Sequence, residues 1–249
     1  MRKIRKNDVI VLVLLLAVLV FFIFNQRNIE PIIFSIFHAN KEALGTYSLV
    51  TYTRQFLTIA VISCALSIII GMLIGIICFT DVGKQFRSVI DKVATVMRSF
   101  PDIAMIYLVI PLLGLGVVPT VVALVAHGIL PIIFAVTSGI DNISPSMIKA
   151  AKGMGMSKGQ IMKNIQLPMA MPVIISGMRV SLISCIGGAT LGSRSGGGGL
   201  GLLLSMGQET YNVLMIMECA LLICLMSLFA DKALKMVEHY FDYSRSLSK

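Results

Sequence analysis

Few residues in this chain have the types and spacing that catalysis or metal binding requires. The three histidines, His38, His127 and His239, form no metal-binding or Ser-His-Asp pattern in the sequence. The five cysteines all lie in apolar stretches, which is typical of small buried hydrophobic residues. The glycines from Gly196 to Gly201 lack the Gly-Lys-Ser/Thr ending of a phosphate-binding loop. We therefore expect neither catalytic residues nor a bound metal or cofactor in this chain.

Two titratable residues, His127 and Glu218, instead lie in the middle of long apolar runs. A charge at the centre of a bilayer costs about 2.5–3.5 kcal/mol on insertion scales and usually faces a bundle interior or a cavity. Two interpretations of these residues stay open. They line a substrate path, or they simply pack inside the bundle or against another subunit. Tyr107 and Pro101 are further candidates for the path or its gate. Pro101 opens an apolar run and can leave backbone carbonyls facing a cavity, although helix-start geometry explains it equally well.

The segments that carry these residues are too apolar for a soluble domain. Of the 249 residues, 57% are hydrophobic and 13% are charged, whereas soluble domains are about 25% charged. The net charge of +9 lies in Lys and Arg blocks between the apolar runs. This placement suits an anionic membrane surface and argues against nucleic-acid binding. The composition predicts an all-α integral membrane protein.

Six transmembrane helices are predicted. The clearest, Phe56 to Phe79, has no charged residue and is long enough for about 30 Å of hydrocarbon at about 1.5 Å per residue. The run from Ile103 to Ile140 is too long for one crossing and contains Pro and Gly, so it is interpreted as two spans joined by a tight turn. A signal peptide is disfavoured for the first span because no small-residue cleavage site follows it. The predicted spans are residues 9–24, 56–79, 99–115, 118–139, 172–192 and 210–230.

The distribution of Lys and Arg predicts the orientation. Sixteen of the 21 lie in the segments that six spans place on one side, four lie on the other side, and Arg179 lies within a span. The positive-inside rule then places both termini in the cytoplasm. Asp102 and Arg179 are near the cytoplasmic ends of their spans, where interfacial anchoring is expected. The organisation is an N-terminal anchor helix with an extracellular connection (1–53), a transmembrane domain (54–230) and a cytoplasmic tail (231–249).

The longest internal cytoplasmic loop, Asp141–Met169, is predicted to form two short helices around a small-residue bend. Ser144 and Pro145 suit the start of the first helix. Ser157 and Gln160 have the spacing of a capping box for the second, which Pro168 is expected to end. The apolar side of such a knob needs a groove on a partner. An amphipathic loop lying on the lipid surface is the alternative.

This loop resembles the coupling-loop motif of the permeases of ABC importers, E-A-A-x3-G-x9-I-x-L-P, and we therefore call the segment Asp141–Met169 the coupling loop. Lys149 stands where that family usually has Glu, and the other motif positions match: Ala150, Ala151, Gly155, Ile165, Leu167 and Pro168. The resemblance implies a bacterial cell-membrane permease whose loop docks into a cleft on separate ATP-binding-cassette ATPase subunits. ATP and Mg would be bound there, and not by this chain. It further implies a second permease subunit, identical or homologous, and an extracellular or periplasmic substrate-binding protein.

The substrate is suggested by further similarities to osmoprotectant permeases, which transport glycine betaine, carnitine or choline. The segments that carry them are 98–101, 110–116, 151–156 and 197–201, and the similarity covers roughly residues 54–230, a MetI-like permease domain. Methionine-type permeases share some of these segments, so an amino-acid substrate stays open. The chain has no Trp, so capture of a quaternary ammonium by cation–π contacts is expected on the binding protein, which would deliver it near residues 193–209.

Two other classes of function remain as alternatives. An ion-coupled secondary transporter would use Glu218 and His127, although the sequence has no detectable inverted repeat. An intramembrane enzyme would need paired catalytic groups at matching depth, which the sequence does not provide.

Overall fold

The computed structural model describes residues 6–25, the single residues 28, 31 and 35, and residues 48–80 and 83–241. Within these ranges all regular secondary structure is helical, as the composition predicts. The elements are α1 (Lys6–Phe24), α3 (Leu49–Ile77), α4 (Gly83–Arg98), α5 (Asp102–Leu113), α6 (Val117–Asp141), α7 (Pro145–Gly153), α8 (Lys158–Ile161), the π-helical turn η2 (Met162–Gln166), α9 (Leu167–Gly192), the 3₁₀ turn η3 (Ser193–Ser195), α10 (Leu200–Glu209) and α11 (Val213–Phe241).

Four helical segments are long and apolar enough to cross a membrane: α3, α6, the continuous run Lys158–Ser195 that contains α9, and α11. The helices α4 and α5 meet at a bend of 104° and would form a fifth crossing if the bent pair is one span. The first predicted span, residues 9–24, is helical as part of α1. Its apolar part, Asp8–Phe24, is shorter than the four long segments. The described residues thus form a multi-pass helical membrane protein with four or five long spans.

The third predicted span, residues 99–115, is shorter in the structure than expected. Its helix, α5, has 12 residues, which at about 1.5 Å per residue is well short of a 30 Å crossing. Pro101 is the N-cap residue of α5 and has an extended backbone, with φ −61° and ψ 143°. Proline also disfavours the helical conformation at the residue before it, Phe100, which separates α5 from α4. The last predicted span is longer than expected, because α11 continues to Phe241 and includes the start of the predicted tail. The predicted extracellular connection lies mostly outside the described residues.

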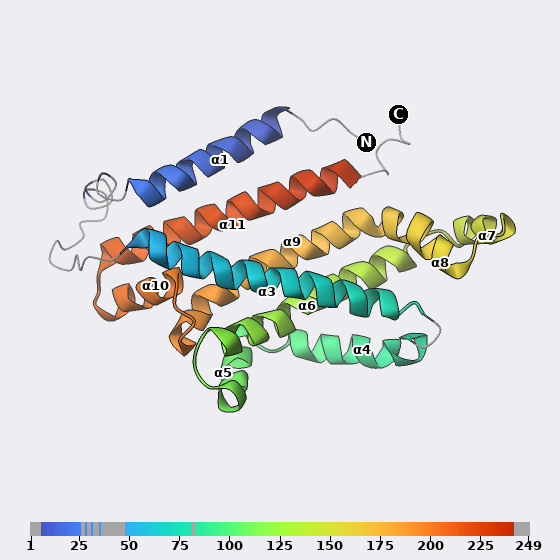
Figure 1. The fold of residues 1–249 in the computed structure, drawn as a ribbon, viewed down its shortest axis with the longest axis horizontal. Helices are drawn as coiled ribbons and strands as arrows, with labels where there is room; N and C mark the ends of the chain where they lie inside the picture. The colour runs from blue at the N-terminus through green and yellow to red at the C-terminus, as the bar shows by residue number, and fades with distance from the viewer. Residues whose placement is uncertain are drawn as a thin grey trace.

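The centre of the bundle is formed by α3, α6 and α9, which run side by side (Figure 1). Small residues bring these helices close together, as in many membrane proteins. A Cβ added at Gly177 of α9 would lie 2.3 Å from Cβ of Ala135 on α6, and one added at Gly75 of α3 would lie 2.7 Å from Cβ of Val136. The backbones therefore approach each other at positions that cannot accept a larger side chain.

The remaining helices flank this centre on two sides. Figure 1 shows α11 and then α1 on one side, and α4 and α5 on the other. An ion pair of 2.8 Å between Lys232 Nζ and Asp8 Oδ1 joins α11 to α1. The helices α7 and α8 project beyond the ends of α3 and α11 at one end of the bundle, and α10 lies at the opposite end (Figure 1). The two loops that the sequence singled out therefore lie at opposite ends.

Candidate functional site

The first helix of the coupling loop begins and ends as its residue types predict. Ser144 is the N-cap residue of α7 and Pro145 its first helical residue, although the Ser144 hydroxyl bonds the Ser146 hydroxyl at 2.6 Å and not a backbone N–H. After α7 the chain reverses through Gly155, whose φ of +81° is left-handed. The Gly155 N–H donates to the Lys152 carbonyl at 3.0 Å. This is the usual way for a glycine to end a helix.

The second helix has the predicted capping box. The Gln160 N–H donates to the Ser157 hydroxyl at 3.3 Å, and the Ser157 N–H donates to Oε1 of Gln160 at 2.8 Å. Two backbone donors that have no partner within a short helix are thereby satisfied. The turn and the capping box together define the shape of the loop.

Pro168 does not end the second helix, and that prediction is wrong. The helix passes through η2, in which the Leu167 N–H donates to the Met162 carbonyl five residues earlier, and continues as α9 to Gly192. An α-helical proline loses a hydrogen bond and clashes with the carbonyl four residues before it. A wider π-helical turn just before Pro168 relieves this conflict. The coupling loop is consequently continuous with α9.

The motif residues lie on α7, on the turn after it, on η2 and at the start of α9. Ala151 is completely buried and Ile161 is nearly so, whereas Met154 is 73% exposed. The remaining motif positions are exposed or partly exposed: Lys149, Ala150, Gly155, Ile165, Leu167 and Pro168. The loop thus has a small apolar interior and an exposed outer surface.

The base of the coupling loop is held by Arg87 of α4, whose role sequence reasoning missed. Its Nη1 lies 3.1 Å from Oδ1 of Asp141, the last residue of α6, and Nη2 contacts Oδ2. The guanidinium also lies 4.8 Å from the centre of the Phe79 ring. A planar guanidinium can make both contacts at once. Arg87 therefore joins α4 and the segment after α3 to the point where the coupling loop begins.

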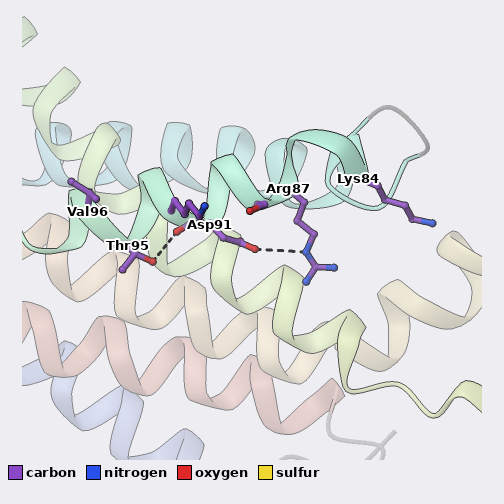
Figure 2. A pocket seen from close by; sticks show the side chains of 7 residues that line it. Lys84, Arg87, Asp91, Thr95 and Val96 are labelled. Carbon is purple, nitrogen blue, oxygen red and sulfur yellow. Dashed lines mark hydrogen bonds and ion pairs between the residues drawn. The ribbon is translucent and has the colours of Figure 1, made fainter.

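A shallow hollow runs along α4 next to this contact (Figure 2). Asp91 lies 3.8 Å from Nε of Arg87, and the Thr95 hydroxyl donates to the Asp91 carbonyl at 2.7 Å. The polar residues share this helix with exposed apolar ones, among them Phe86 and Val89. The hollow is lined by Lys84, Arg87, Ser88, Asp91, Lys92, Thr95 and Val96. Because α4 is amphipathic, it suits a boundary between water and an apolar phase.

His127 lies beside a carboxylate and faces a hollow between α6 and α9. Its Nε2 is 3.1 Å from Oδ1 of Asp102 at the start of α5. Its Nδ1 is buried and has no hydrogen-bond partner among the described residues. The hollow is lined by His127, Leu130, Pro131, Phe134, Ala135, Ser138, Val173, Ser176, Gly177, Val180 and Ser184. Asp102 thus pairs with His127, and this mixed polar and apolar surface could contact a small solute.

The other candidate path residues have different surroundings. Pro101 is the N-cap residue of α5, and its carbonyl accepts hydrogen bonds from the N–H groups of Ala104 and Met105 at 3.0 and 3.2 Å. Tyr107 is 52% exposed on α5. Glu218 is completely buried on α11. Tyr107 is therefore exposed and His127 partly exposed on the surface of the chain, whereas Glu218 is enclosed.

Arg179, expected to anchor at the membrane interface, binds two carboxylates of α11. Its Nε and Nη2 lie 3.0 and 2.7 Å from Oδ1 of Asp231, and its Nη1 lies 2.7 Å from Oε2 of Glu238. These partners are 52 and 59 residues away in the sequence. Opposite charges held this close compensate for each other at membrane depth. The cluster joins α9 to α11.

The glycine-rich loop at the opposite end, Gly196–Gly201, is closely packed. The Gly199 N–H donates to Oε1 of Gln55 at 3.2 Å, and a Cβ at Gly199 would lie 2.9 Å from Cα of Phe56. The Gly116 N–H donates to the Ser195 carbonyl at 2.8 Å. The loop thereby joins the starts of α3 and α6 to the end of α9.

Comparisons with known proteins agree with this architecture. Residues 67–242 match the family model described as the binding-protein-dependent transport system inner membrane component. The chain is 32% identical over 186 residues to the choline transport system permease protein OpuBB of Bacillus subtilis, covering 75% of this chain and 85% of that protein. It is 33% identical over 188 residues to the osmoprotectant import permease protein OsmW of Salmonella typhimurium, covering 74% and 86%.

Solved structures are similar in fold. The inward-facing MetNI methionine ABC transporter matches with a TM-score of 0.70 at 23% identity, covering 78% of this chain and 95% of that one. An amino acid ABC transporter matches with a TM-score of 0.65 at 17% identity, covering 77% and 93%.

Proposed function

The chain belongs to the family of binding-protein-dependent transport system inner membrane components, and from this we propose that it is the permease subunit of an ATP-driven importer for an osmoprotectant such as glycine betaine, carnitine or choline. The observation that carries the substrate class is the 32–33% identity to choline and osmoprotectant permeases over three quarters of the chain. Methionine is the weaker alternative, because the methionine transporter shares the fold at only 21–23% identity.

The proposal includes the topology that the charges predict. Six crossings by α1, α3, the α4–α5 pair, α6, α9 and α11 would place both termini and the coupling loop in the cytoplasm of a bacterial cell. The glycine-rich loop would then face the outside and receive substrate from a binding protein. Residues 54–230 would form the permease domain, with α1 as an added anchor helix. The excess of Lys and Arg on one side supports this orientation, because twelve lie there and four on the other side even when the four basic residues of α4 are counted within a span.

The substrate path would lie between this permease and a second one, identical or homologous. The hollow that contains His127 supports a path along α6 and α9, because Ser138, Ser176 and Ser184 supply hydroxyls among apolar neighbours. Such a surface offers few strong contacts to a quaternary ammonium. High-affinity capture would therefore belong to the binding protein, and the permease would supply a weakly binding route with Pro101 and Tyr107 near its gate.

Energy would enter through the coupling loop. Two ATPase subunits that hold ATP and Mg would close on nucleotide and displace the loop. A ligand shifts a protein between two conformations only if it binds them with different affinities. ATP would be that ligand, and it would bind the ATPase partner. The continuous helix from α8 through η2 to α9 supports a lever, because a displacement at Lys158 can reach Gly192 without a break in the helix.

Reconstitution of this chain with its cognate ATPase and binding protein in lipid vesicles tests the function. We expect uptake of choline, carnitine or glycine betaine to require both ATP and the binding protein, with methionine uptake at background. Methionine uptake at a comparable rate would contradict the substrate class. Uptake that an ion gradient drives without the ATPase would contradict the importer and favour the ion-coupled alternative.

A further inference from the structure

The coupling loop has an unusual charge balance. It contains four lysines, Lys149, Lys152, Lys158 and Lys163, and no Asp or Glu occurs from Asn142 to Gln208. Its single carboxylate, Asp141 at its first position, is bound by Arg87. The projecting part of the loop therefore carries only positive side-chain charges.

These positive charges are available to a partner. Lys149, Lys152 and Lys163 are exposed, and across the described part of the chain none of the three has an ion-pair partner. Lys149 and Lys152 are three residues apart on α7, so they lie on the same face of the helix. The exposed Met147 and Met154, at 38% and 73%, add apolar surface near them. The complementary surface would combine carboxylates with apolar contacts.

The shape of the loop favours a protein partner over the lipid surface. The helices α7 and α8 project beyond the ends of the neighbouring helices (Figure 1). Membrane-surface helices lie flat with one apolar face in the headgroup region. This loop is instead two short helices that the Gly155 turn and the Ser157 capping box hold in a compact shape.

We propose that the coupling loop docks into an acidic cleft on its ATPase subunit and that Lys149 pairs with a carboxylate there. This inference rests on the proposed function and names the electrostatic character of the partner. The related motif has Glu at the position of Lys149, and a Glu would need a cationic partner. The reversed charge makes this permease select ATPases with an acidic cleft and reject those with a basic one, because like charges oppose docking.

Charge variants of the full chain in lipid nanodiscs, titrated with the cognate ATPase, test this pairing. We expect Lys149→Glu to weaken ATPase binding by about tenfold or more, and Lys149→Arg to retain binding. Lys235→Glu, the same charge change at an exposed position on α11 away from the loop, is the matched control and should leave binding within about twofold. Binding by the unaltered chain should also weaken as salt is added.

A zero-length carbodiimide, which forms an amide between an amine and a carboxylate in contact, gives a second measurement. Mass spectrometry should find Lys149 joined to an Asp or Glu of the ATPase, and Lys149→Arg should remove that product. Unchanged ATPase binding by Lys149→Glu would overturn the pairing. Equal losses of ATPase binding for Lys149→Glu and Lys235→Glu would also overturn it if both variants bind anionic vesicles less well to the same extent. The lysine charge would then act on lipid and not on the ATPase. If the unaltered chain does not bind the ATPase, the proposed function itself fails.

Discussion

Substitution of Gly155 is expected to uncouple ATP hydrolysis from transport by straining the backbone. The φ of Gly155 is +81°, and a Cβ added there would have no atom within 4 Å. A larger side chain therefore meets open space, and its cost is conformational. An L residue other than glycine pays roughly 1–2 kcal/mol in the left-handed region, and Asn pays less than most. A loss of this size lowers the population of the native turn by a factor of about 5 to 30.

A series at this position separates backbone strain from other effects. Gly155→Asn should couple nearly normally, Gly155→Ala should couple less well, and Gly155→Val should be worst because a β-branched residue is the least tolerant of positive φ. The measurement is the number of ATP molecules hydrolysed per solute imported by the reconstituted complex, which should rise in that order. Gly153→Ala is the matched control. Gly153 lies in helix α7, also faces open space and has no positive φ, so alanine should be tolerated there.

The reasoning would be refuted by equal uncoupling in Gly155→Asn and Gly155→Val, because strain predicts a difference between them. Normal coupling in Gly155→Val would also refute it. Impaired coupling in Gly153→Ala would show that any added side chain disturbs docking, whatever its backbone conformation.

Three further predictions concern the helices that the loop would move. Gly177→Ala should lower the free energy of unfolding by about 1–3 kcal/mol because its methyl group would overlap α6, whereas Gly187→Ala, with no atom within 4 Å of its Cβ, should leave it unchanged or raise it by up to about 1 kcal/mol in thermal unfolding, because alanine favours a helix interior. Arg179→Met should destabilise by less than the about 3–5 kcal/mol of a fully buried pair, and Asp231→Asn should partly rescue it. Arg87→Lys should leave the unfolding free energy within about 1 kcal/mol but speed amide hydrogen exchange in α4, since lysine cannot hold a carboxylate at two points.

Much of the helical organisation follows from local sequence. The apolar runs, the Ser144–Pro145 start and the Ser157–Gln160 box each depend on residues close together in the chain, and the structure contains all three features. The helix α4 can be predicted from its local sequence in the same way. Its exposed apolar residues, among them Phe86, Val89 and Val93, recur at helical spacing.

The features that sequence reasoning missed depend on contacts between distant residues. The sequence alone predicts an interfacial position for Arg179, because nothing near it in the chain identifies its two partners on α11. These partners are more than 50 residues away in the sequence. Arg87 was likewise counted only as a cytoplasmic charge, although Asp141, 54 residues later, binds it. The error at Pro168 has another cause. The rule that proline ends a helix applies to α-helical geometry, and the π-helical turn before it supplies a different geometry.

That turn also determines how a displacement of the coupling loop would spread. A helix broken at Pro168 would act as a hinge, and the loop could move without α9. A continuous helix instead transmits the movement to two sets of contacts: the close packing at Gly177 against α6, and the ion pairs of Arg179 with α11. Both sets resist small adjustments, because one has no spare volume and the other holds a guanidinium 2.7–3.0 Å from two carboxylates. If the chain has the proposed role, α6, α9 and α11 should therefore move together as one body. The hollow beside His127 should keep its walls from α6 and α9, and the movement should open it to one side of the membrane and then to the other.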